Sequence, residues 1–225
     1  PINGKPLLLR LIDRFKKANI KKVITVAGFK SEKIDVPNIE IIKNDQFRTN
    51  GELSSLSLAK KRFSNDMVIL YGDLIFRGYV IKGLVESNRE LTVVVDSSKT
   101  KPSKRGDNDF AFCSVEDNRA LWGQDVLLNF ISDSPEKNGY RCCGQWIGMI
   151  RVNGKGRTWI ETAIKNLEQT PKFTKLNMGD LLNKVIEHGH PIRVIYIHGH
   201  WLNVNSLSDL ELARSSFSIS DNYSD

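Results

Sequence analysis

Short runs of β-branched residues alternate with helical segments along the first hundred residues of the chain. Residues 23–27, 39–42, 67–71 and 91–95 read as short buried strands, whereas residues 6–18 and 52–63 repeat apolar side chains at helical spacing. This alternation is typical of parallel βαβ units with right-handed crossovers. We therefore predict an α/β fold, Rossmann-like, with a mixed, mostly parallel sheet flanked by helices.

The second half of the chain adds features of antiparallel structure. We predict short strands at 110–115, 120–130, 145–151, 192–197 and 201–204, and helices at 156–167, 176–188 and 207–214. The polar segment 99–109 contains a proline and a glycine, which favour a loop. We expect a single domain over residues 1–217 and a frayed tail at 218–225.

Composition excludes several classes of protein. Apolar residues make up 40% of the 225 positions, which is too many for a disordered chain with a net charge of only +7. No apolar run reaches the 18 residues that a membrane-spanning helix needs, and the cations form no aromatic-interleaved stripe for nucleic acid. Three cysteines, two of them adjacent, make a poor disulfide framework, so we expect a cytoplasmic location.

Asp73 is the first candidate functional residue, because it follows the buried strand predicted at 67–71. Open α/β sheets bind ligands at the carboxyl ends of their parallel strands, and Gly72 lets a phosphate approach the backbone closely. A carboxylate is the hard oxygen donor that Mg²⁺ prefers. We predict that Asp73 is a catalytic residue and a metal ligand. The structural alternative is an aspartate that caps the next helix.

Two asparagines near the C-terminus form a second candidate. Asn203 and Asn205 alternate along a predicted short strand, so their side chains share one face. Together with Asp73 they could complete a Mg²⁺ site, although neutral amides bind metal more weakly than carboxylates do. The alternative is that Asn205 and Ser206 begin the last helix as a cap.

A third candidate is the helix start at 49–56, which is rich in small polar residues and follows Asn44 in the chain. Free backbone N–H groups at such a start can hold a phosphate, although a plain capped helix would look the same. Other chemistries are excluded. The four histidines lack zinc-site spacing, and the chain has neither a P-loop nor a Gly-x-Ser-x-Gly elbow.

Taken together, these segments resemble the nucleotidyltransferase superfamily, which couples an NTP to a sugar phosphate, phosphocholine or phosphonate. The resemblance rests on residues 3–8, 26–30, 72–73 and 201–205. Residues 50–56, 144–148, 178–182 and 190–197 are similar to one branch, the cytidylyltransferase-like domains associated with phosphoenolpyruvate mutase. The matched segments run over nearly the whole chain.

The resemblance implies a GT-A-like nucleotidyltransferase fold and a Mg²⁺-dependent transfer of CMP from CTP to a phosphonate such as 2-aminoethylphosphonate, with release of pyrophosphate. It also implies fusion to, or association with, phosphoenolpyruvate mutase. It assigns nucleotide binding to Gly28, Ser55 and Gly72. It assigns acceptor binding to Glu52, Trp146 and Asp180, where the alternative for Trp146 is core packing.

Two departures from the superfamily pattern keep other functions open. The first strand and the Gly-rich loop that clamps the triphosphate would precede Pro1, so we expect the chain without them to bind CTP poorly. Asparagine stands at 203 and 205, where the family often has aspartate. The alternatives are a non-catalytic domain that binds a nucleotide or a partner, and a sugar-phosphate or phosphocholine nucleotidyltransferase. A glycosyltransferase ranks last, because Gly72-Asp73-Leu74-Ile75 lacks an Asp-x-Asp motif.

Overall fold

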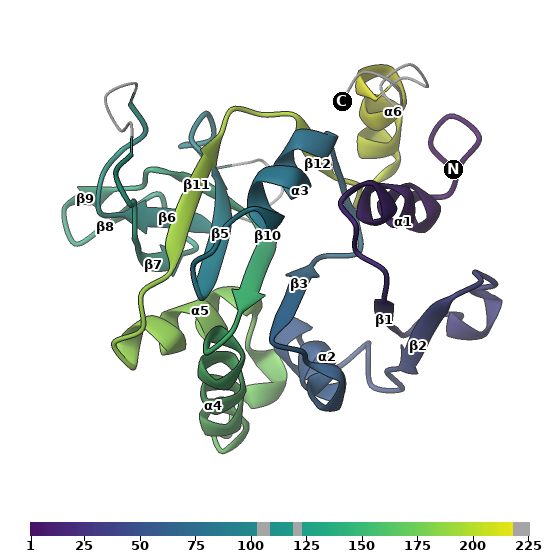
Figure 1. The fold of residues 1–225 in the computed structure, drawn as a ribbon, viewed down its shortest axis with the longest axis horizontal. Coiled ribbons are helices and arrows are strands. Elements are labelled where there is room, and N and C mark those ends of the chain that lie inside the picture. The colour runs from purple at the N-terminus through teal and green to yellow at the C-terminus, as the bar shows by residue number, and fades with distance from the viewer. Residues whose placement is uncertain (103–108, 119–122, 218–225) are drawn as a thin grey trace.

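The computed structural model describes residues 1–102, 109–118 and 123–217. Its largest sheet has the strand order β11-β5-β10-β6-β7, and β3 pairs with a further part of β10 (Figure 1). These strands are β3 (Asp66–Leu70), β5 (Leu91–Asp96), β6 (Phe110–Cys113), β7 (Leu128–Ser132), β10 (Gly144–Asn153) and β11 (Arg193–Ile197). Because β3, β5 and β6 all run antiparallel to β10, and β11 runs parallel to β5, these four strands share one direction. The predicted mixed, mostly parallel sheet is confirmed.

Three smaller strand pairs surround this sheet. They are β1 (Val23–Ala27) with β2 (Ile39–Lys43), β4 (Leu74–Phe76) with β12 (Trp201–Asn203), and β8 (Glu136–Lys137) with β9 (Tyr140–Arg141). The parallel pair β1–β2 is joined by the 3₁₀ turn η1 (Ser31–Lys33) and not by an α-helix. Among the described residues, β1 pairs only with β2 and β3 only with β10, so each keeps an edge without a strand partner.

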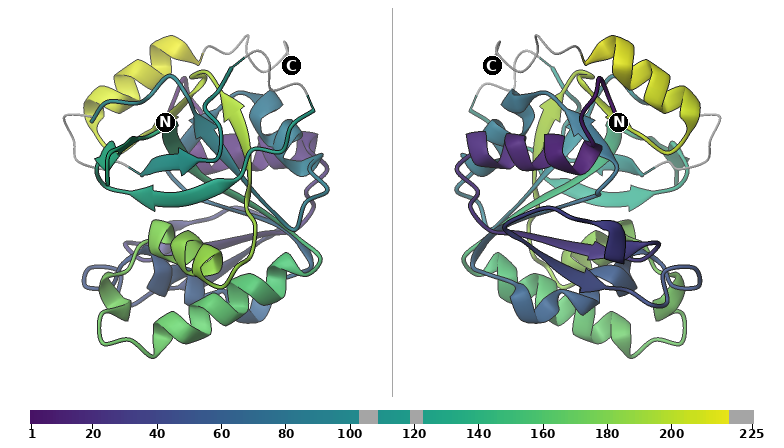
Figure 2. Two further views of the ribbon diagram at one scale, coloured as in Figure 1. Left: turned by 90° about the vertical axis from the view of Figure 1, so that its left-hand side faces the viewer. Right: turned by 90° about the vertical axis from the view of Figure 1, so that its right-hand side faces the viewer.

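Helices cover both faces of the large sheet. The helices α2 (Glu52–Leu58), α4 (Gly156–Glu168) and α5 (Met178–Glu187) contribute to one apolar core, whereas α1 (Leu7–Lys17) and α3 (Gly78–Val85) contribute to the other. Figure 2 shows α4 and α5 in green on one side of the strands and α1 in purple on the opposite side. The sheet is therefore the middle layer of a three-layer sandwich.

Burial on both faces explains the unbroken apolar runs of the central strands. In β5, Leu91, Val93 and Val95 pack into the core beneath α4 and α5, and Val94 packs into the core beneath α1 and α3. All six residues of β5 are buried. This is the two-sided burial expected of a strand covered by helices on both faces.

Helix α3 and the strands β4, β8 and β9 lie in segments where no element was predicted, and two predicted elements differ in extent. The strand predicted at 120–130 begins only at Leu128, because Gly123 has a φ of +76°, which an extended strand cannot contain; residues 119–122 lie outside the described residues. The helix predicted at 52–63 ends at Leu58 and continues as the 3₁₀ turn η2 (Lys60–Arg62), whose Lys60 binds the carboxylate of Glu168 on α4.

The start of the chain packs against the last helix, α6 (Leu207–Ser216). The side-chain amide of Asn3 donates to the carbonyl oxygens of Arg214 and Phe217, and Ile2 is buried beside Phe217. The predicted frayed tail at 218–225 lies outside the described residues. No helix in the described part of the chain is both long and apolar enough to cross a membrane.

Candidate functional site

A pocket of about 460 Å³ opens where the carboxyl end of β3, the start of β10 and the start of α5 meet β12. Its lining includes Asp73, the two asparagines and the residues predicted to bind the acceptor. Six of the nine predicted site residues line it, namely Glu52, Asp73, Trp146, Asp180, Asn203 and Asn205. The two expected metal segments, about 130 residues apart in the sequence, therefore lie at one cavity.

The pairing of β4 with β12 brings Asp73 to this pocket. Leu74 lies opposite Asn203 in the antiparallel ladder, and the backbone N–H of Val204 donates to the carbonyl oxygen of Asp73 at 2.9 Å. Asp73 therefore lies opposite Val204, the residue between the two asparagines. The helix that follows, α3, begins at Gly78 with Arg77 as its N-cap, so Asp73 does not cap it.

The asparagines differ in their surroundings. The side-chain oxygen Oδ1 of Asn203 is buried and has no hydrogen-bond partner among the described residues. A buried acceptor without a partner costs about 1–3 kcal/mol, and a bound cation would satisfy it. Ser206 and not Asn205 caps α6, because its hydroxyl accepts from the N–H of Asp209.

The donor chemistry of this group fits a hard cation. One carboxylate and two amide oxygens are ligands of the kind that Mg²⁺ accepts while it keeps waters and substrate phosphates. No group of three histidine, cysteine or acidic side chains suited to a metal occurs in the described residues.

Glu52 on α2 contacts Tyr71, which follows β3, and the first residue of α5 at the pocket. Its Oε2 atom accepts hydrogen bonds from the hydroxyl of Tyr71 at 2.7 Å and from the backbone N–H of Met178 at 3.3 Å. Burial raises the pKa of Tyr71 well above its ordinary value, and the nearby carboxylates of Asp109 and Glu52 raise it further. Tyr71 therefore stays a neutral donor that fixes the position of the Glu52 carboxylate.

Trp146 belongs to the core and to the pocket wall at once. Its ring is only 2% exposed, its Nε1–H donates to the carbonyl oxygen of Met149 at 3.0 Å, and it packs against the Tyr71 ring with 5.8 Å between the centroids. Gly148 makes this packing possible, because a Cβ atom there would lie 2.1 Å from the Tyr71 ring. Trp146 therefore packs in the core, which was the structural alternative, and it also lines the pocket.

Asp180 has a structural role at the start of α5. Its Oδ2 accepts from the backbone N–H of Asn177, while the Asn177 side chain accepts from the N–H of Asp180, both at 2.9 Å. This capping box fixes the first turn of α5. It also holds a negative charge in place at the pocket.

Several lining residues, among them three further charges, were not predicted from the sequence. Asp109, Asp133 and Lys137 all line the pocket, and each comes from a polar segment without hydrophobic periodicity. No local signal marks such residues, since only the folded chain brings the segments together. Five carboxylates and a single lysine are found among the described lining residues, so the pocket is strongly acidic.

The three predicted nucleotide-binding residues are not among the residues that line the pocket. Gly28 packs under Phe47, whose Cβ would lie 2.3 Å from a Cβ added at position 28. The hydroxyl of Ser55 accepts a hydrogen bond from the amide of Asn44 at 3.0 Å. Gly72 is exposed, with open space where a side chain would be. Gly72 nevertheless lies between two lining residues, Tyr71 and Asp73.

The proposed phosphate-binding helix start is occupied by other contacts. The backbone N–H of Gly51 donates to the carbonyl oxygen of Thr174 at 2.5 Å, and that of Leu53 donates to the carbonyl of Leu176 at 3.3 Å. These N–H groups are therefore used within the fold. Lys104 and Arg105, in the loop predicted at 99–109, lie outside the described residues.

The three cysteines are free thiols with distinct environments. A hydrogen bond from the Cys113 thiol, aided by the backbone N–H of Cys113 and opposed by burial, lowers the pKa of Cys143 to about 6. Burial raises the pKa of Cys142. Alkylation of Cys143 by iodoacetamide should therefore be half-maximal near pH 6, because the thiolate is the nucleophile.

Mass spectrometry of the alkylated peptides, measured over a pH series, tests this expectation. The variant Cys113→Ala should move the Cys143 midpoint up toward the ordinary value of about 8.5. A common midpoint near that value for Cys142 and Cys143 in the unmodified sequence would contradict it.

Comparison with known proteins yields matches to nucleotidyltransferases. Residues 1–104 match the family model of the MobA-like NTP transferase domain. Over 222 residues the chain is 24% identical to the bifunctional protein GlmU of Methanococcus maripaludis, covering 96% of this chain but only 48% of that relative. It is 23% identical to the CTP:phosphoglutamine cytidylyltransferase of Campylobacter jejuni, covering 89% of this chain and 84% of the relative.

Solved structures show the same fold at lower sequence identity. The CTP:phosphocholine cytidylyltransferase LicC of Streptococcus pneumoniae superposes with a TM-score of 0.70 at 16% identity, covering 97% of this chain and 88% of the other. The inositol-1-phosphate CTP transferase of T. maritima also gives 0.70, at 13% identity, with 96% and 85% covered. At these identities the likeness is one of fold.

Proposed function

Because the chain has the nucleotidyltransferase fold and matches an NTP transferase domain over residues 1–104, we propose that it transfers a cytidylyl group from CTP to a phosphorylated or phosphonate acceptor that carries an amine. One observation supports this proposal most strongly. Asp73, Asn203 and Asn205 line one pocket, and the buried Oδ1 of Asn203 lacks a partner among the described residues. This pocket also contains the residues that would hold the acceptor.

The reaction needs alignment and charge compensation more than covalent chemistry. An oxygen of the acceptor attacks the α-phosphorus of CTP in line, a new P–O bond forms, and the bond to the departing pyrophosphate breaks. Mg²⁺ held by Asp73, Asn203 and Asn205 would neutralise charge on the nucleotide phosphates. The carboxylate and the two amides act by fixing that binding position before substrates arrive.

The charge of the pocket supports an acceptor with an amine. Glu52 and Asp180 are both fixed by hydrogen bonds to neighbouring elements, so their carboxylates are preorganised to receive a cation. The Tyr71 and Trp146 side chains line the same pocket, and a cation over such a ring gains about 0.5–2 kcal/mol. An acceptor without an amine would leave these carboxylates without a cationic partner from the substrate.

The names of the relatives are consistent with this class. Two of the relatives described above are named for cytidylyl transfer to phosphoglutamine or phosphocholine. A phosphonate such as 2-aminoethylphosphonate likewise combines a cationic nitrogen with an anionic phosphorus group. We include association with phosphoenolpyruvate mutase in the proposal as a consequence of the resemblance in residues 50–56 and 144–148.

The direct test is release of pyrophosphate from CTP and Mg²⁺ with a panel of acceptors. The panel contains 2-aminoethylphosphonate, phosphocholine, ethylphosphonate without the amine, and glucose 1-phosphate. The assay uses the full-length gene product, so that any segment encoded ahead of Pro1 is included. We expect turnover with 2-aminoethylphosphonate and phosphocholine, the two acceptors that carry a cationic nitrogen. Turnover with glucose 1-phosphate alone would favour a sugar-phosphate enzyme, and CTP binding without any turnover would favour a non-catalytic domain.

Lys137 gives a second prediction, because it is the one cation among the described residues that line the pocket. Its β8–β9 hairpin brings a positive charge to a cavity with five carboxylates, where the anionic end of the acceptor needs compensation. A charge-assisted hydrogen bond is worth about 1.5–3 kcal/mol. Lys137→Ala should therefore raise the KM for the acceptor about tenfold or more, with a smaller change in kcat.

Steady-state kinetics with varied acceptor measure this effect. The matched control is Lys165→Ala on the exposed face of α4, which should leave the KM unchanged. Equal kinetics for the two variants would show that Lys137 does not contact the acceptor.

A further inference from the structure

We propose that Asp96, the last residue of β5, is a positioning residue that holds β12 in register and thereby places Asn203 at the pocket. The inference rests on the proposed function for its catalytic consequence. Its structural part concerns only how one buried carboxylate fixes the turn between β11 and β12. Asp96 does not line the pocket, so it acts through other residues.

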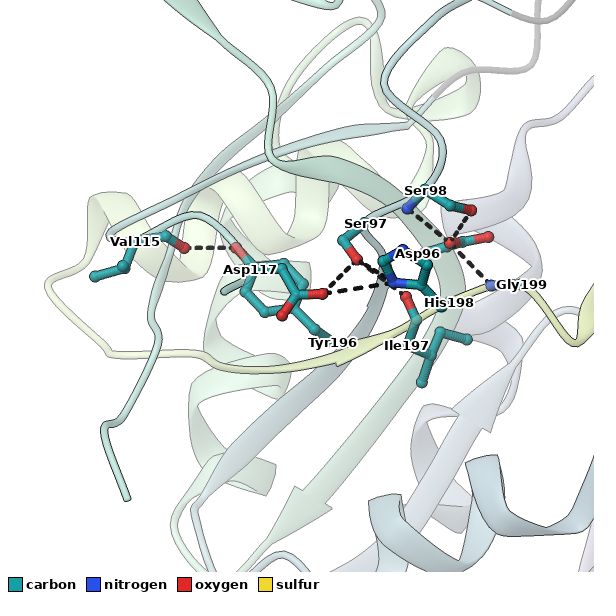
Figure 3. A network of polar contacts seen from close by, with 9 residues as sticks. All are labelled: Asp96, Ser97, Ser98, Val115, Asp117, Tyr196, Ile197, His198 and Gly199. Atoms are coloured by element: carbon teal, nitrogen blue, oxygen red, sulfur yellow. Dashed lines mark hydrogen bonds and ion pairs between the residues drawn. The ribbon is translucent and has the colours of Figure 1, made fainter. Parts of the chain in front are cut away.

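The Asp96 side chain is completely buried and accepts four hydrogen bonds. Its Oδ2 accepts from the indole Nε1–H of Trp201 at 2.8 Å. Its Oδ1 accepts from the backbone N–H of Gly199 at 3.1 Å, and from the N–H and hydroxyl of Ser98 at 3.0 and 2.6 Å (Figure 3). The carboxylate thus ties the end of β5 to the turn that precedes β12 and to the first residue of β12.

Only a carboxylate satisfies this arrangement. Burial by itself would raise the pKa of Asp96, but the hydrogen bonds from Ser98, Gly199 and Trp201 outweigh it and hold the pKa below its ordinary value. An asparagine here would turn an N–H₂ group toward one of the donors, whichever way its amide is oriented. At least one buried donor would then lose its acceptor.

The turn that Asp96 binds needs external support. Gly199 and His200 both have a φ of +66°, and His200 is not a glycine, so its left-handed conformation is unfavourable. The hydroxyl of Tyr79 lies 2.9 Å from Nδ1 of His200, a second contact that supports the turn. Trp201 follows immediately and is 4% exposed. Because Trp201 is the first residue of β12, its position determines the path of this strand to Asn203.

A neighbouring set of contacts supplies a control. The hydroxyl of Ser97 contacts Asp117 at 2.5 Å and Nδ1 of His198 at 3.0 Å, and His198 is 74% exposed (Figure 3). Serine and aspartate meet the same ring nitrogen, so this trio lacks the order of a nucleophilic triad. These contacts bind His198, directly after β11, whereas Asp96 binds Gly199 and Trp201, which are closer to Asn203.

The test compares Asp96→Asn with Asp117→Asn, the same chemical change on the two sides of this network. The first readout is the ¹H–¹⁵N spectrum of the metal-free protein. Asp96→Asn should shift the signals of the Trp201 indole and of the Asn203 side-chain amide, whereas Asp117→Asn should leave both in place. Unmoved Asn203 signals in a folded Asp96→Asn protein would overturn the proposal.

The second readout is the affinity for Mn²⁺, measured by electron paramagnetic resonance. We expect about a tenfold loss for Asp96→Asn and a similar loss for the conservative Trp201→Phe, which removes the indole donor and keeps an aromatic ring. The double variant should lose no more than Asp96→Asn alone, because both changes break one chain of contacts. Fully additive losses would overturn the proposal.

These readouts separate the inference from the proposed function. Absence of pyrophosphate release in the wild-type protein would contradict the proposed activity, while the Asn203 signals would still decide whether Asp96 positions β12. If Asp96→Asn does not fold, Trp201→Phe answers the same question with the same signals.

Discussion

Asp73→Ala should lower the rate of cytidylyl transfer about 10³-fold while the fold stays intact. Asp73 is the one carboxylate in the proposed metal group, and the loss of a group that stabilises transition-state charge costs about 10²–10³ in kcat. A 10³-fold loss corresponds to about 4 kcal/mol of transition-state stabilisation. The measurement is pyrophosphate release under saturating CTP, together with circular dichroism to show that the variant is folded.

The control variant for this experiment changes a carboxylate outside the pocket. Asp66 is exposed at the start of β3 and pairs with Arg151, so Asp66→Ala should leave turnover nearly unchanged. Asp73→Asn is a further informative variant, because an amide could retain part of the metal binding. A full rate for Asp73→Ala would remove Asp73 from the catalytic machinery.

Gly148→Ala should lower the free energy of unfolding by about 3 kcal/mol. The φ of Gly148 is +82°, which costs an alanine roughly 1 kcal/mol, and its Cβ would lie 2.1 Å from the Tyr71 ring. Overpacking of this kind typically adds about 1–3 kcal/mol. The ring would also be pushed from its contact with Trp146, so the pocket wall should change as well. Urea denaturation measures the loss.

Gly189→Ala isolates the backbone part of that cost. Gly189 has nearly the same φ of +78°, but no atom lies within 4 Å of an added Cβ. We expect a loss of about 1 kcal/mol for this variant. Equal losses at positions 148 and 189 would mean that the Tyr71 ring moves away without cost, contrary to our account of the pocket wall.

The large-scale fold could be predicted because its signals are local. The β-branched run of β5 and the helical spacing in α1 each reflect burial of that segment alone, and both were located correctly. The beginning of β7 was wrong because it depends on the conformation of Gly123. Which strands pair with β10 is likewise not a property of any one segment.

In the candidate site, too, only the residues with a local sequence signal could be predicted. The local pattern singled out Asp73, Asn203 and Asn205, since each lies at the end of a recognisable strand. Lys137 gave no such signal, because only the pairing of β8 with β9 brings it to the cavity. Gly28 is predicted to bind the nucleotide, and in the structure a Cβ added there would lie 2.3 Å from Phe47. Sequence shows that a glycine is needed, not which neighbour needs it.

The central claim is that Asp73, Asn203 and Asn205 together bind one divalent cation. Mn²⁺ broadens the NMR signals of nuclei close to it, so a titration of the ¹⁵N-labelled protein maps the binding position directly. We predict that signals of residues 72–74 and 202–205 disappear first, at substoichiometric Mn²⁺, and that Asp73→Ala abolishes this selectivity. Broadening that begins at another part of the chain, or that spares residues 202–205, would contradict the claim.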